Sequence, residues 1–139
     1  MDGWRRPAPD ECATAAPLGS LVTRDELATT RLIKIDVEGA EDRVLVGMLG
    51  SVDALAADAE IFVEVNATFW SDPQLRPIDV LRPFLDRGFH VYLVPAIYWP
   101  WRYLWSPRMS APQRLRESAV LEQRGRPDIV LSRIDADAL

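Results

Sequence analysis

The feature that most constrains this fold is the segment at residues 32–41, which reads LIKIDVEGAE. Ile33 and Ile35 alternate with a lysine, and the apolar run then ends in carboxylates and a glycine. In open α/β sheets, ligands bind in the crevice beyond the carboxyl ends of the strands. The segment therefore predicts a buried strand over residues 32–37, with acidic side chains at its end beside a ligand crevice.

The rest of the chain alternates between strand-like and helix-like segments. Mostly apolar runs predict further strands at residues 60–65, 89–94 and 128–132. Apolar residues at helical spacing predict two short helical pieces after residue 41, the second capped by Ser51, and one helix over residues 78–87. This order of elements predicts an α/β fold with helices packed on a mainly parallel sheet.

Length and composition narrow the protein class. The 139 residues suffice for one domain or part of one, and we expect a flexible, proline-containing lead-in at residues 1–17 before a domain at 18–139. The net charge of −5 argues against a nucleic-acid partner, since phosphate contacts need a basic surface. No apolar run reaches the roughly 18 residues of a membrane span, and no secretory signal opens the chain, so a cytoplasmic protein is expected. Cys12 is the only cysteine, which excludes an intrachain disulfide.

The motif IKIDVEGAE at residues 33–41, followed by Val44, Leu45 and Gly47, resembles the FkbM family of S-adenosylmethionine-dependent methyltransferases. The acid-ended strand at 61–64 and the strand at 128–132 also fit the family. The resemblance implies a partial Rossmann-like class I methyltransferase sheet, made of the family's last four strands, mainly parallel with an antiparallel final pair. It further implies an O-methyltransferase acting on a sugar or polyketide/natural-product hydroxyl.

The cofactor segment of that family has no counterpart in this sequence. Family members hold S-adenosylmethionine mainly through a glycine-rich turn after the first strand and an acid that ends the second. No G-x-G occurs here, and only about 30 residues precede the strand at residue 32, too few for three strands and their helices. We therefore expect a truncated chain without cofactor-binding residues, with weak affinity for S-adenosylmethionine and little or no activity alone.

The acidic strand end supplies the candidate catalytic residues. Asp36 and Glu38 are predicted to orient or deprotonate the acceptor hydroxyl, or to hold a divalent ion that does so. The alternative is structural: Asp36 accepts amide hydrogen bonds from the following turn, and Glu41 favours the amino terminus of the next helix.

The candidate substrate-binding residues come from strand ends and from an aromatic, proline-rich loop whose rings could stack on a sugar face. For the strand ends the alternative is an ordinary strand-to-loop transition, and for the loop it is burial of its own rings. The predicted residues are Glu41, Glu64, Asn66, Trp99 and Trp101.

Two other functions remain open. One is a non-catalytic, methyltransferase-like interaction module that self-associates or binds a partner through the exposed edge of the strand at residue 32. The other is a metal-dependent hydrolase that uses Asp36, Glu38 and Glu64 on a hard ion such as Mg²⁺. No histidine pair supports a metal site, and we assign neither a metal ligand nor a role for the single histidine, His90.

Overall fold

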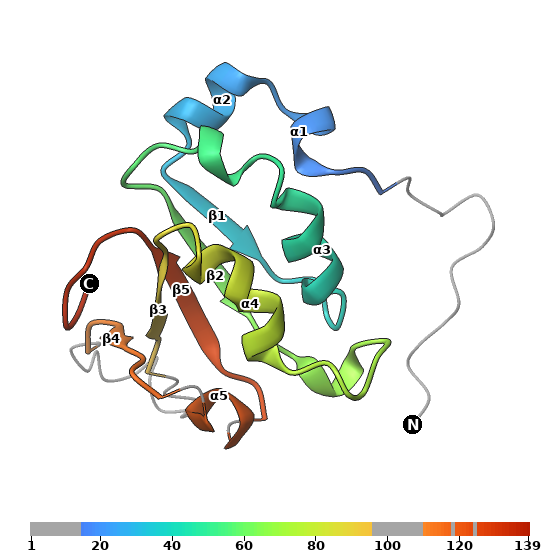
Figure 1. Cartoon of the computed structure of the whole chain (residues 1–139), viewed down its shortest axis with the longest axis vertical. Coiled ribbons are helices and arrows are strands. Elements are labelled where there is room, and N and C mark those ends of the chain that lie inside the picture. Colours follow the sequence, from blue (N-terminus) through green and yellow to red (C-terminus); the bar gives the residue numbers. More distant parts are fainter. Residues whose placement is uncertain (1–14, 96–109, 118, 124) are drawn as a thin grey trace, which may run out of the picture.

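The computed structural model describes residues 15–95, 110–117, 119–123 and 125–139 (Figure 1). The helices are α1 (Leu18–Leu21), α2 (Arg24–Thr29), α3 (Glu41–Met48), α4 (Pro77–Leu85) and α5 (Ala119–Gln123). Two short 3-10 helices are η2 (Val52–Ala54) and η3 (Ala67–Phe69). The strands are β1 (Leu32–Ile35), β2 (Glu60–Glu64), β3 (His90–Leu93), β4 (Gln113–Arg114) and β5 (Asp128–Ser132).

The five strands of the described part form one sheet in the order β1-β2-β5-β3-β4. β1 and β2 pair in parallel, whereas β2 with β5, β5 with β3, and β3 with β4 pair antiparallel. β5 runs opposite to both of its neighbours, so β1, β2 and β3 point in one direction. The α/β class is therefore confirmed, and the expectation of mainly parallel pairing is wrong, because the reversed β5 separates β2 from β3 and the unpredicted β4 adds another antiparallel pair.

The helices follow the predicted pattern with local differences. α3 ends at Met48 and η2 follows, which confirms two helical pieces. The predicted cap at Ser51 is wrong, because its side chain makes no capping hydrogen bond. A capping residue typically has an extended backbone, whereas Ser51 has φ −116° and ψ −13°. α4 begins with Pro77, whose missing N–H costs nothing in a first helical turn, and Pro83 lies inside the helix.

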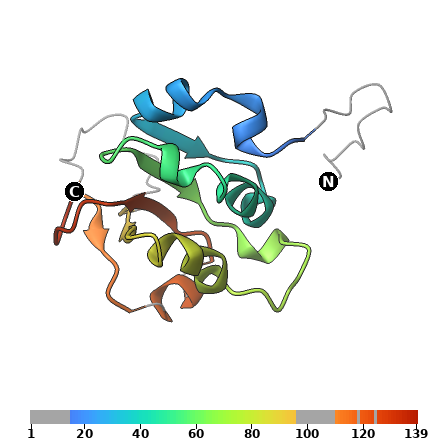
Figure 2. The same ribbon diagram turned by 45° about the horizontal axis from the view of Figure 1, so that its top comes forward.

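One face of the sheet packs against α3 and α4, which lie on the same side of it (Figure 2). Ile61, Val63, Ile129 and Leu131 are fully buried there. Side chains alternate between the faces of a strand, so Glu64 and Asp128, which are register partners, project from the opposite face. In the part of the chain that the structure describes, no helix is long and apolar enough to cross a membrane.

Candidate functional site

Carboxylates converge where β1 and β2 end and β5 begins. Asp36 directly follows β1, Glu64 is the last residue of β2, and Asp128 is the first residue of β5, opposite Glu64 in the register. Asp36 and Glu38 are exposed, and both lie near enough for their charges to act on Glu64. The structure thus places the predicted Asp36 and Glu38, together with Asp128, within electrostatic range of Glu64. These four residues form the carboxylate cluster.

The electrostatics raise the pKa of two members of the carboxylate cluster, Glu64 and Asp128. Burial raises the pKa of Glu64, and the charges of Asp128, Asp36 and Glu38 raise it further, while Arg126 opposes them. Burial also raises the pKa of Asp128, with Asp36 adding to the effect. A partly buried carboxyl whose pKa is raised by burial and by neighbouring acids is a candidate for accepting or donating a proton at a reaction site.

A lysine stands beside these acids. The Nζ atom of Lys34 donates to Oδ2 of Asp36 at 2.8 Å, and this bond raises the pKa of Lys34. The two side chains are 61% and 40% exposed, so the ion pair contributes little to stability. The Lys34 charge also lowers the pKa of Asp128, which keeps the cluster from being uniformly repulsive.

Glu41 ties the loop after β1 to the loop after β2. Its side chain is 1% exposed, its Oε1 accepts from the backbone N–H of Gly39 at 2.7 Å, and its Oε2 accepts from Nε1 of Trp70 at 2.8 Å. The sequence predicted Glu41 as a substrate ligand, yet both of its oxygens are used within the protein. The geometry gives Glu41 a positioning role: it fixes the loop that carries Asp36 and Glu38.

The same loop needs a glycine. Glu38 has φ 52° and Gly39 has φ 102°, so the chain turns through a left-handed conformation between β1 and α3. A Cβ on Gly39 would lie 2.4 Å from the Cβ of Phe69 and 3.2 Å from its carbonyl oxygen. The glycine therefore permits close approach of the two loops as well as the turn itself.

Asn66 is 2% exposed, which leaves its side chain little access to a ligand. With its amide oxygen turned toward Arg126, it accepts from Nε at 3.2 Å and from Nη2 at 3.3 Å. The guanidinium also lies 5.4 Å from the ring centroid of Phe69. Asn66 is thus placed to position Arg126, whose charge lowers the pKa of Glu64.

Trp99 and Trp101 lie outside the described residues. Sequence reasoning missed Trp70, Arg126 and Asp128 as parts of the site. Asp128 becomes identifiable only when β5 is known to pair with β2, whereas the sequence around Trp70 and Arg126 carries no signal of their partners.

Metal chemistry has no support from the geometry. Within the described ranges, no three histidine, cysteine, aspartate or glutamate side chains stand close enough together to hold a metal ion. The metal-dependent hydrolase therefore stays without a structural argument.

Comparison of the chain with protein-family models, with curated proteins and with solved structures found no match.

Proposed function

We propose that this chain forms the acceptor side of an FkbM-like, S-adenosylmethionine-dependent O-methyltransferase that acts on a sugar or polyketide/natural-product hydroxyl. The observation that carries the proposal is the conformation of the IKIDVEGAE residues, whose turn after β1 gathers Asp36 and Glu38 beside Glu64. The strand directions agree with it, since β1, β2 and β3 point one way and the last strand, β5, is reversed.

The carboxylate cluster suits an acceptor hydroxyl. Methyl transfer requires the acceptor oxygen to be aligned with the methyl group and to lose its proton. The exposed Asp36 and Glu38 are suited to accept hydrogen bonds from neighbouring hydroxyls. Glu64 is the best placed to receive a proton, because its pKa is already raised by burial and by nearby acids.

The described residues do not fit S-adenosylmethionine. A cradle for such a ligand needs backbone amides exposed beside small residues. Gly39 is the glycine beside the carboxylate cluster, and Phe69 already fills the space next to it. We therefore assign the acceptor side alone to these residues and attribute no step to the cofactor.

An NMR titration of the ¹⁵N-labelled chain tests this assignment, with methyl glycosides and a polyhydroxylated macrolactone as probes. We expect saturable shifts in the amide signals of Gly39 and Glu64, reduced by Asp36→Asn or Glu64→Gln. Asp25→Asn, which removes an exposed carboxylate from α2, is the matched control. Shifts that are absent, or that persist in both site variants, would contradict the proposal, and tight binding of S-adenosylmethionine by the chain alone would contradict the acceptor-only assignment.

A second candidate is a non-catalytic module that associates through β1. The observation in its favour is the position of β1 at the end of the strand order, with Leu32 62% exposed. An apolar edge strand is a template for pairing with another chain.

A further inference from the structure

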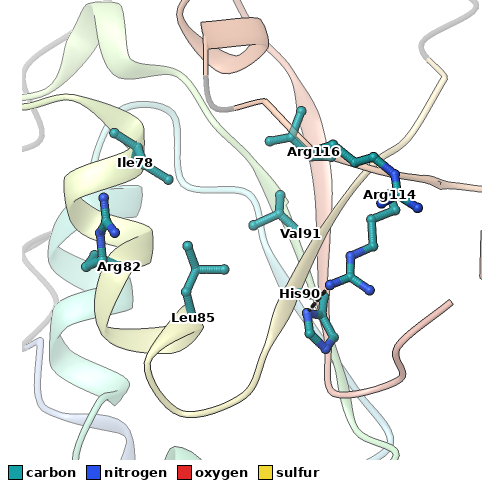
Figure 3. A pocket seen from close by; sticks show the side chains of 8 residues that line it. Ile78, Arg82, Leu85, His90, Val91, Arg114 and Arg116 are labelled. Atoms are coloured by element: carbon teal, nitrogen blue, oxygen red, sulfur yellow. Dashed lines mark hydrogen bonds between the residues drawn. The ribbon is translucent and has the colours of Figure 1, made fainter. Parts of the chain in front are cut away.

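A cavity of about 270 Å³ lies between α4 and the sheet edge made by β3 and residues 113–116 (Figure 3). It is lined by Ile78, Arg82, Leu85, His90, Val91, Arg114, Leu115 and Arg116. The cavity adjoins the amino end of β3, whereas the carboxylate cluster lies at the carboxyl ends of β1 and β2, which run in the same direction as β3. The two sites are therefore at opposite ends of the strands.

The walls of this cavity are of two kinds. Ile78 and Leu85 from α4 and Val91 from β3 project into the space between helix and sheet (Figure 3). The charged lining consists of three arginines, and no acidic residue is among the lining side chains. Within the described residues, the side chain of the exposed Arg82 makes no hydrogen bond or close ion pair, although its charge lowers the pKa of Asp79, so its guanidinium N–H groups are available to a ligand. The side chains that line the cavity thus carry only positive charge, in a chain whose net charge is −5.

His90 is neutral, so the arginines alone supply the positive charge of the cavity. Nη2 of Arg114 lies 2.7 Å from Nδ1 of His90, and a guanidinium keeps its protons, so it donates and Nδ1 accepts. The imidazole is then neutral and carries its proton on Nε2. Burial lowers the pKa of His90, and the charge of Arg114 lowers it further, which agrees with this tautomer.

Two of the arginines are held by replaceable partners. Arg114 pairs with Asp135 and Arg116 pairs with Asp137, and both acids lie after β5 near the end of the chain. The aspartate side chains are 71% and 86% exposed, and the Arg116–Asp137 pair, exposed on both sides, is weak. The Arg114 side chain is 23% exposed, so the Arg114–Asp135 pair is screened less by solvent. An oxyanion brought by a ligand can therefore displace Asp137 at small cost, and it can replace the exposed carboxylate of Asp135 on Arg114 by an equivalent charged group.

We propose that this cavity binds a small amphipathic anion: one terminal carboxylate or phosphate on a short apolar chain. The arginines hold the oxyanion, since their planar N–H groups match both kinds of head group. Ile78, Leu85 and Val91 cover the apolar chain. Because the volume falls just below the range of about 300–1,000 Å³ usual for drug-sized ligands, the ligand is small. Asp135 and Asp137 compete with it for the arginines.

Titration calorimetry with octanoate, octyl phosphate and octanamide tests the proposal. The two anions differ in head group, and octanamide keeps the chain without the charge. We expect binding of at least one anion about tenfold tighter than that of octanamide, the usual effect of a hydrogen bond to a charged group. The tighter of the two anions identifies the head group. Equal affinity for all three probes, or no binding at millimolar concentration, would overturn the proposal.

Matched variants locate the binding. Arg82→Gln is expected to weaken anion binding severalfold, whereas Arg24→Gln, on the exposed surface of α2, leaves it unchanged. The double substitution Asp135→Asn with Asp137→Asn is expected to tighten binding, because it removes the competing carboxylates. Both positions in each test are exposed, so the variants should fold, and circular dichroism checks this. If Arg82→Gln and Arg24→Gln behave alike, or if the double variant does not bind more tightly, the anion does not occupy this cavity.

Discussion

Gly39 occupies a position where a larger residue would meet two separate obstacles. Its backbone φ of 102° is one that residues with a Cβ rarely adopt. In addition, the Cβ of Phe69, in the loop after β2, lies 2.4 Å from the place where a Cβ on Gly39 would be. Gly88, at φ 81° after α4, has the first constraint only, since no atom lies within 4 Å of its ideal Cβ. Substitutions at these two glycines therefore separate the cost of backbone strain from the cost of crowding.

Substituting alanine for Gly39 should therefore destabilise the fold by about 3 kcal/mol, the sum of backbone strain and overpacking. Gly88→Ala, which carries the strain alone, should cost about 1 kcal/mol. Urea unfolding of both variants gives the comparison. Similar losses for the two would show that Phe69 yields to the added methyl group without cost.

Single residues also mark how far sequence reasoning reaches. Asp36 and Glu64 are identifiable because strand ends are local features, readable from an apolar run that stops. The positioning role of Glu41 is not, because its partner Trp70 is 29 residues away and only the folded chain brings the two together. A carboxylate that follows a strand end is therefore easily predicted as a ligand when its role is to hold two loops together.

At the scale of elements, the antiparallel pairing of β2 with β5 is what concentrates charge. It sets Glu64 opposite Asp128, and burial together with that neighbour raises the pKa of Glu64 above the ordinary value of 4.5. A carboxyl whose pKa is higher in the folded state destabilises the fold once it ionises. The penalty is absent below the unfolded pKa and grows as the pH rises through the folded pKa.

Glu64→Gln should accordingly leave stability unchanged near pH 4 and increase it at pH 7, by less than about 1 kcal/mol for a partly solvated group. Thermal unfolding across this pH range measures the effect. Glu26 provides a control of opposite sign: the backbone and side-chain hydrogen bonds from Thr23 lower its pKa, so its contribution is present above pH 4.5 and is lost as the pH falls. Glu26→Gln should therefore weaken the fold at pH 7. A Glu64→Gln variant that is less stable at pH 7 would show that the charged form is the favoured one.

The elements themselves were largely predictable, whereas their pairing was not. The segment Asp128–Ser132 has the predicted bounds, because its apolar run stands between polar residues. The apolar run does not indicate whether β5 joins the sheet at its edge or between β2 and β3. Strand order depends on contacts between segments about 70 residues apart, and periodicity reports only on near neighbours. β4, two residues long, is too short to leave a pattern at all.

At the scale of the whole molecule, the sheet ends at β1 on one side. Leu32 is 62% exposed on this strand, and in the described part of the chain β2 is its only strand partner. Such an edge promotes association between chains.

The mass measured by light scattering after size exclusion should therefore increase with protein concentration, and Leu32→Lys should abolish the increase by placing a charge on the edge. Val46→Lys is the matched control, since Val46 is also exposed, at 58%, but lies on α3. A mass that stays monomeric at every concentration, or that depends equally on both positions, would contradict association through β1.

The central position of β5 has a consequence for synthesis of the chain on the ribosome. β2 and β3 are made first, yet each lacks the neighbour that lies between them until residues 128–132 have emerged. Until then both strands present unpaired N–H and C=O groups along the edges that β5 will occupy. The apolar residues of β2 and β3 also lack the strand that joins them into one face. The nascent domain is therefore most vulnerable to aggregation and to proteases just before its last strand arrives, and the sheet closes from its middle.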